Sequence, residues 1–202
     1  MPIRRAPFWV AMFAVLAVGC SVQSDLMKST GQAPASLRPE PGKALVVFLR
    51  PEYSGYRVQA VVYDADSYIG VVSRFAAVPF DAAPGHHRFM VVSEAADFLD
   101  ADLLPGRTYF VEVVPRLGAW RARFSLRPWD GVRDRGRIAS ALSEARVVRT
   151  NEDGRQWDVD NRRSVLAKKA KYEPDWMQKP ARPYLPPEAG WTVESVPPLP
   201  SQ

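Results

Sequence analysis

A row of arginines is the largest group of side chains in this sequence with the chemistry to bind a ligand. Arg116, Arg121, Arg123 and Arg127 fall within one short segment. The last three alternate with other residues, so an extended strand places them on one face, with about 6.5–7 Å between alternate positions. Guanidinium groups bind phosphates and carboxylates through paired hydrogen bonds. The row is therefore a candidate site for a phosphate, a carboxylate-bearing glycan or an acidic partner. The simpler alternative is a solvated strand face that pairs with Asp or Glu across the sheet.

The other polar residues with catalytic or metal-binding chemistry are two histidines and three closely spaced aspartates. His86 and His87 are adjacent in a predicted turn, and neighbours on an extended chain point in opposite directions. We therefore expect no shared metal site. Asp97, Asp100 and Asp102 have the spacing of a catalytic carboxylate pair, but nothing beside them distinguishes an acid from a base. Phosphate-binding loops, nucleophile elbows and zinc-protease helices have no counterpart in the sequence, so we predict neither a cofactor nor an enzyme.

The N-terminus has the three parts of an export signal. Arg4 and Arg5 supply positive charge, residues 6–18 are largely apolar, and the small residue Gly19 precedes Cys20. The apolar run is shorter than the roughly 20 residues that a membrane-spanning helix needs. It therefore predicts a signal peptide over residues 1–19.

The segment Leu16-Ala17-Val18-Gly19-Cys20 resembles the lipobox of bacterial lipoproteins, with Leu one place further upstream than is usual. The resemblance implies cleavage before Cys20 and a diacylglycerol thioether on its sulfur. Cys20 is the only cysteine in the chain and cannot form an internal disulfide. Several acyl chains together anchor a protein stably to a membrane. Because Ser21, and not Asp, follows the cysteine, the resemblance further implies the outer membrane, with the protein facing the periplasm.

The charge of the mature chain is mild. Removing residues 1–19 takes away two arginines and no acidic residue, which lowers the formal charge from +5 to +3. A balance of this size does not indicate nucleic acid as a partner. A membrane surface or an envelope polymer remains compatible with it.

Composition divides the mature chain into four regions. Residues 20–42 are rich in Ser, Gln, Ala and Pro and predict a flexible linker. Residues 43–129 carry seven or eight short strand patterns, which predict an antiparallel β-sandwich. Residues 130–172 predict a helical extension, with a short amphipathic helix from Arg137 to Arg149 and a second, thin helix from Asp160 through Lys171. Residues 173–202 contain eight of the 19 prolines and predict an extended tail that is free beyond Pro180.

Within the sandwich region, three patterns are most informative. The apolar run 44–50 predicts a strand buried on both faces. Residues 64–67 predict a hairpin turn between strands over 57–63 and 68–72, and Ile69 stands where a calcium-binding loop would require glycine. Residues 120–127 alternate apolar and polar, which predicts that Trp120 and Phe124 are buried, near Phe48 and Tyr109, while Arg121, Arg123, Ser125 and Arg127 face solvent.

Several short sequences in this region resemble a known domain. They include Phe48-Leu-Arg-Pro51, Pro84-Gly-His-His87 and Gly106-Arg-Thr-Tyr-Phe110. These residues resemble an uncharacterised domain of small bacterial envelope lipoproteins, which is similar to the PEGA-type β-sandwich modules of bacterial surface proteins. The resemblance covers about residues 43–129. It implies a fold and a location but no chemistry.

Together these observations predict a membrane-anchored envelope lipoprotein that acts as a non-enzymatic binding or scaffolding module. Its expected partners are the membrane, through lipid on Cys20, and an envelope protein or cell-wall polymer. One alternative is an envelope hydrolase that acts on cell-wall material through a dispersed carboxylate site. Another is a purely structural lipoprotein without a specific ligand.

Overall fold

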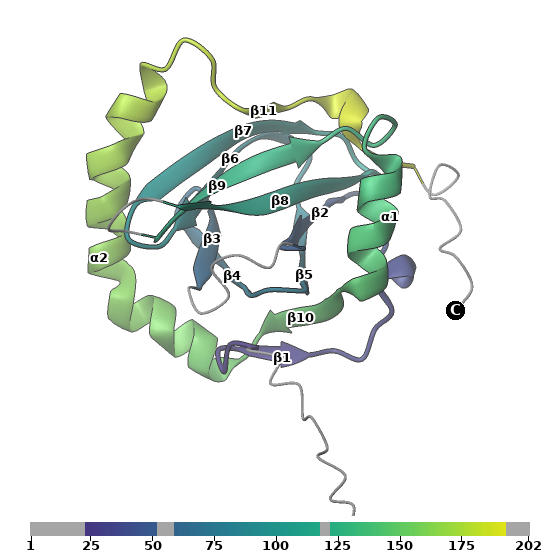
Figure 1. Ribbon diagram of the computed structural model, residues 1–202, viewed down its shortest axis with the longest axis horizontal. Helices are drawn as coiled ribbons and strands as arrows, with labels where there is room; N and C mark the ends of the chain where they lie inside the picture. The colour runs from purple at the N-terminus through teal and green to yellow at the C-terminus, as the bar shows by residue number, and fades with distance from the viewer. Residues whose placement is uncertain (1–22, 52–58, 118–121, 193–202) are drawn as a thin grey trace, which may run out of the picture.

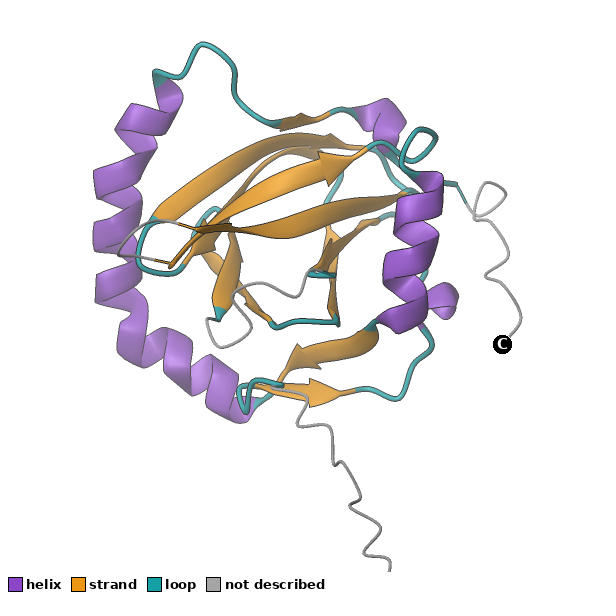
Figure 2. Cartoon of the chain, in the orientation of Figure 1, coloured by secondary structure: helices purple, strands orange, loops and turns teal. Residues whose placement is uncertain are grey.

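The computed structural model describes residues 23–51, 59–117 and 122–192 (Figure 1). The strands are β1 (Met27–Ser29), β2 (Ala44–Leu49), β3 (Ala60–Asp64), β4 (Ser67–Val72), β5 (Ala76–Ala82), β6 (Gly85–Val92), β7 (Ala96–Leu103), β8 (Thr108–Leu117), β9 (Ala122–Trp129), β10 (Arg146–Thr150) and β11 (Tyr184–Leu185). The helices are α1 (Arg135–Glu144) and α2 (Glu152–Met177), with short 3₁₀ turns at Pro34–Ser36 and Pro187–Ala189. Figure 2 shows the strands stacked between the two helices.

The strands form two mixed sheets, which gives an α/β fold. One sheet has the order β1-β10-β5-β2-β8-β9 and the other the order β11-β7-β6-β3-β4. Most neighbours are antiparallel, but β2–β8, β10–β5 and β11–β7 are parallel. The prediction of a purely antiparallel sandwich is therefore wrong. Two parallel neighbours such as β2 and β8 cannot be joined by a short hairpin and need a long crossover. Here the chain between them forms β3 and β4 of the other sheet, β5 on the opposite side of β2, and then β6 and β7.

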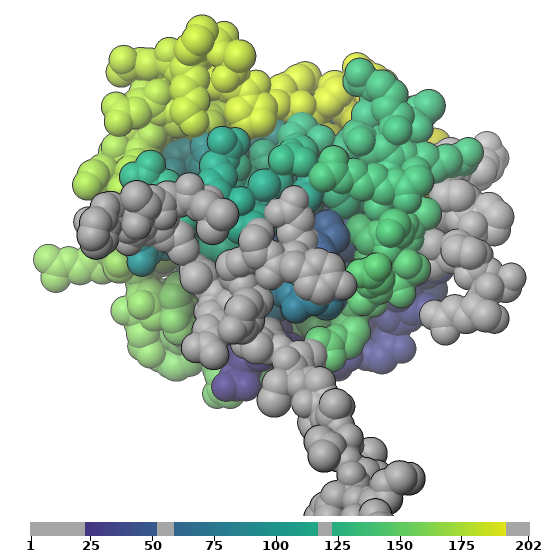
Figure 3. All heavy atoms as spheres, viewed as in Figure 1, coloured from purple at the N-terminus to yellow at the C-terminus, as the bar shows by residue number. Residues whose placement is uncertain are grey.

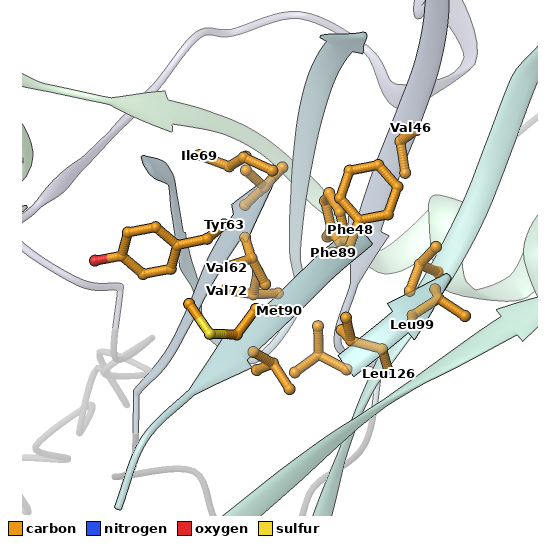
Figure 4. Close-up of a cluster of buried hydrophobic side chains, with 14 of the residues drawn as sticks. Val46, Phe48, Val62, Tyr63, Ile69, Val72, Phe89, Met90, Leu99 and Leu126 are labelled. Carbon is orange, nitrogen blue, oxygen red and sulfur yellow. The ribbon is translucent and has the colours of Figure 1, made fainter. Parts of the chain in front are cut away.

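The main core lies between the sheets and is built from alternate residues of the central strands. Val46 and Phe48 of β2 face Phe89 of β6 and Leu99 of β7 (Figure 4). The rings of Phe48 and Phe89 meet edge to face, with their centres 5.3 Å apart. The intervening residues of β2 pack on the opposite face, so all six are buried, as the apolar run predicts.

Each helix covers the outer face of one sheet. Ile138 and Leu142 of α1 belong to a second apolar cluster on the six-stranded sheet. Helix α2 lies along the five-stranded sheet, where Trp176 packs on Phe98 of β7 at 5.6 Å between ring centres. A strand residue such as Tyr63 is consequently fully buried, although it points away from the inter-sheet core.

Helix α2 begins earlier and is longer than the sequence pattern indicates. The side chain of Asn151 accepts a hydrogen bond from the Gly154 N–H at 2.9 Å, and Glu152 and Asp153 occupy the first turn. A side-chain cap and acidic residues at this end both stabilise a helix. The predicted second helix, 160–171, is only the middle of this element, because its thin apolar face hides the capped start. None of the helices in the described part of the chain is long and apolar enough to cross a bilayer.

Two segments predicted to be separate from the fold are packed on it. In the expected linker, Ser24 and Met27 are buried and β1 pairs with β10. In the expected free tail, β11 pairs with β7, and Trp191 packs on Phe110 with ring centres 4.9 Å apart. A few apolar side chains in a polar or proline-rich context are enough to dock a segment when a matching surface exists. Residues 1–22, including Cys20, and residues 193–202 lie outside the described residues.

Candidate functional site

Two adjoining grooves run along the free edge of β9, opposite the end of α2 and the segment that follows it. One has a volume of about 240 Å³ and the other about 430 Å³. Both are lined by Asp97 of β7, Arg116 of β8, Ser125 of β9 and Lys179. In Figure 3 the yellow-green residues after α2 lie directly above the teal and green surface of the strands. We refer to the two grooves together as the β9 groove.

Three of the four predicted arginines line this groove, and two of them lie opposite each other. Arg116 of β8 and Arg123 of β9 are directly opposite each other in the antiparallel register, so they share one face of the sheet. Both are exposed, and neither forms an ion pair with a carboxylate of the described residues. Arg121, like Trp120, lies outside those residues. In the part of the chain that the structure describes, the expected row therefore comprises Arg123 and Arg127 on one face of β9, with Arg116 of β8 opposite Arg123.

Arg127 has a different environment, because its guanidinium contacts a buried carboxylate. Glu112 lies opposite Arg127 in the register and is fully buried. Its Oε2 lies 3.3 Å from Arg127 Nη1 and 3.3 Å from Arg137 Nη2, and it accepts a 3.0 Å hydrogen bond from Trp129 Nε1. Sequence reasoning missed Glu112. It stands inside the apolar run of β8, and that break in the apolar pattern was the signal that could have revealed it.

The β9 strand is fixed by its inward-facing residues. Phe124 and Leu126 are buried in the main core, as the alternation predicts, and Phe48 and Tyr109 are buried in the same cluster. Ser125 is also buried, so the prediction of a fully wet outer face is wrong at this position. The groove walls exclude solvent from Ser125 while leaving the longer arginine side chains on either side in contact with water.

The opposite wall of the groove carries both charge and aromatic surface. Asp97 pairs with Lys179 at 3.3 Å, and Asp175 is a further acidic residue of the wall. Tyr172 is half-buried and supplies apolar surface, whereas Trp176 is almost fully buried in this wall. Lys179 pairs with Asp97, and Arg127 pairs with Glu112. The guanidinium groups of Arg116 and Arg123 are therefore the cationic groups of the groove lining that have no carboxylate partner among the described residues.

The three aspartates proposed as carboxylate candidates do not form one site. Asp97 faces the groove, whereas Asp100 and Asp102 lie on the outer face of the sheet. Asp100 accepts two hydrogen bonds from Arg88, at 2.7 and 3.3 Å. Asp102 contacts Tyr184 at 2.5 Å and His86 at 3.0 Å, and the Tyr184 hydroxyl, ahead of His86, lowers the pKa of this carboxyl. A general acid would need the opposite shift.

The histidines lie on β6 and not in a turn. His86 contacts Asp102, whereas His87 lies 2.8 Å from Asp64 and 2.7 Å from the Ala83 carbonyl oxygen, so they serve different partners. Because both ring nitrogens of His87 face acceptors, the protonated form is favoured, and the hydrogen bond to Asp64 raises its pKa despite burial. No group of three or more His, Cys, Asp or Glu side chains among the described residues is arranged to hold a metal ion.

No protein-family model matches this chain, and no curated protein matches it either.

Proposed function

We propose that this protein is a membrane-anchored envelope lipoprotein that binds an anionic partner in the β9 groove and catalyses no reaction. The observation that carries the proposal is the opposed pair Arg116 and Arg123. Like charges directly opposite each other on a strand pair are unfavourable. An anion between them removes that repulsion and gains charge-assisted hydrogen bonds.

The shape and composition of the groove favour an extended acidic ligand over a small ion. The two hollows adjoin along β9, so a chain-like ligand can occupy both. Tyr172 offers apolar surface beside the charge. Carboxylate-bearing wall polymers and acidic segments of envelope proteins both have these features, and the resemblance to envelope lipoprotein domains supports the same setting.

The alternative function is an envelope hydrolase that uses Asp97, because this carboxylate lies in the groove beside Asp175. Its ion pair with Lys179 opposes that role. Loss of any wall-degrading activity in Asp97→Asn, with unchanged ligand binding, would support the hydrolase over the binding module.

The anchoring part of the proposal is tested by Cys20→Ala in the full chain. We expect loss of acyl incorporation and release of the protein from the membrane fraction, because the thioether is the proposed attachment. Labelling with a radioactive fatty acid and fractionation measure both effects. Unchanged acyl incorporation in the variant would contradict the proposal.

The binding part is tested with the mature soluble chain and two probes, poly-glutamate and polyphosphate, measured by calorimetry. Arg116→Gln and Arg123→Gln should each weaken the preferred probe about tenfold or more, because a hydrogen bond to a charged group contributes about 1.5–3 kcal/mol. Arg163→Gln is the matched control, since Arg163 is exposed on α2 and removes the same charge. Equal weakening in all three variants, or no saturable binding of either probe, would contradict an anion site in the groove.

A further inference from the structure

The folded body begins very close to the proposed lipid anchor. Ser24 is 2% exposed, and its backbone N–H donates a hydrogen bond to Ser73 Oγ at 3.3 Å. Only three residues separate Ser24 from Cys20. Four Cα-to-Cα steps span at most about 14 Å when fully extended. A lipid on Cys20 would therefore hold the surface around Ser24 against the bilayer.

The segment after Ser24 is inserted firmly into the fold. Met27 is buried, and its Sδ accepts a hydrogen bond from the Val71 N–H at 3.2 Å. The backbone oxygen of Leu26 accepts from the Asn151 N–H at 3.2 Å, and Asn151 Nδ2 donates to the Asp25 carbonyl oxygen at 2.7 Å. We call the surface formed by residues 24–29 and the start of α2 the tether corner. Separating this surface from the rest of the fold would break these hydrogen bonds.

The tether corner and the β9 groove lie at opposite ends of the molecule. Strand β1 is one edge of the six-stranded sheet and β9 is the other, which places them about 24 Å apart for strands about 4.8 Å apart. Helix α2 gives an independent measure. It starts beside Leu26 and ends with Trp176 in the groove wall, and from Gly154 to Trp176 it rises about 33 Å. Figure 1 shows α2 running from β1 at the bottom to the β11 side at the top.

We infer that the tether corner is the face that rests on the bilayer carrying the protein's own lipid, so that the β9 groove lies on the far side of the molecule, about 24–33 Å from that face. This inference rests on the proposed lipidation and deepens the proposed function. It places the groove's ligand away from the head groups of the anchoring membrane, because they lie beyond the reach of Arg116 and Arg123.

Charge does not set this orientation. Lys28 and Arg149 lie opposite each other at the corner, and the exposed Asp25 and Asp153 offset them. A near-balanced surface gains little from anionic lipids. The short tether fixes the orientation, which should therefore persist when salt screens surface charges.

The test couples the Cys20 thiol of the mature chain to maleimide head groups in a nanodisc, so that it does not depend on acylation in the cell. A fluorescent non-natural residue replaces the exposed Lys28 of β1 or the exposed Gln178 after α2. Nitroxide-labelled head groups then quench nearby fluorophores. We expect loss of most of the fluorescence at position 28 and little loss at position 178, at low and high salt alike.

A second form carries a long Gly-Ser insertion between residues 22 and 23. The difference in quenching between positions 28 and 178 should shrink, because the longer tether frees the body to rotate. Equal quenching at the two positions with the native tether, or a difference unchanged by the insertion, would overturn the inference. Failure of the proposed function would appear separately, as missing acylation in the cell or missing probe binding by the soluble chain.

Discussion

Arg116 and Arg123 lie directly opposite each other across the β8–β9 pair, at the mouth of the β9 groove. Cross-strand neighbours of like charge lower the stability of a sheet, by an amount comparable to the 0.2–1 kcal/mol typical of such pairs. A pair that costs stability and faces a groove is typical of a site shaped for a ligand rather than for the fold.

Replacing one of these arginines should therefore change stability and binding in opposite directions. We expect Arg123→Gln to raise the free energy of unfolding by roughly 0.2–1 kcal/mol at low salt, because it removes the repulsion from Arg116. The gain should fade at high salt. Urea unfolding measures it, and Arg163→Gln should show no comparable gain. A clear loss of stability in Arg123→Gln would mean that this arginine has a structural role.

The buried carboxylate of Glu112 should contribute far more to the free energy of unfolding than an exposed carboxylate does. Glu112→Gln weakens its contacts with Arg127 and Arg137 and should lower the free energy of unfolding by about 1.5–3 kcal/mol, the range for hydrogen bonds to charged groups. The control is Glu152→Gln, whose carboxylate is 84% exposed in its pair with Arg155. An exposed pair of that kind contributes about 0–1 kcal/mol. Equal effects in the two variants would show that burial does not strengthen the Glu112 contacts.

His87 should make the stability of the protein depend on pH. Asp64 raises its folded-state pKa above the ordinary 6.5. The stabilisation is therefore fully present below pH 6.5 and is lost as the pH rises through the raised pKa. Wild type should exceed His87→Gln in unfolding free energy by more at pH 5.5 than at pH 8.5. Urea titrations at the two pH values give this difference, and a larger advantage at pH 8.5 would reverse the assigned sign.

Phe124 should contribute strongly to the stability of the fold at the β9 edge. Its side chain is 5% exposed, and the guanidinium of the buried Arg50 lies 4.7 Å from the centre of its ring. Phe124→Ala should cost about 3–5 kcal/mol through the cavity that it leaves, with the loss of the cation–π contact adding to this. Thermal or urea unfolding checks the value. An unchanged unfolding curve would mean that this face of β9 is not packed in the core.

Trp191 should hold the last described segment on the fold. Its backbone forms two hydrogen bonds of 2.8 Å with Thr108, and its indole is 4% exposed. Trp191→Ala should cost about 3–5 kcal/mol and should expose residues after 178 to limited proteolysis. Gly131→Ala should do the same, because a methyl group there would overlap the indole. Rapid cleavage after residue 180 in the wild type would instead support the prediction, made from the prolines, that this tail is free.

The strand interiors could be predicted from the sequence because side-chain periodicity reports burial directly. The apolar run of β2 predicts a strand with both faces covered, and the turn over 64–67 predicts the β3–β4 hairpin. The alternation around Phe124 predicts its inward side chain. The docking of β1 and β11 could not be predicted, because three or two residues are too few to show a period.

The sequence by itself determined which residue types are available and which faces of the longer strands are buried. Only the tertiary structure decided which strands are neighbours, because that choice depends on crossovers and on the fit of distant surfaces. The register of β8 on β9 places Arg116 against Arg123 and Arg127 against Glu112. Arg116 and Arg123 thus face each other in the groove, whereas Arg127 pairs with the buried Glu112. The sequence alone places these three arginines in one cluster. A one-residue slip of β9 in that register would remove both pairings, since every β9 side chain would turn to the other face.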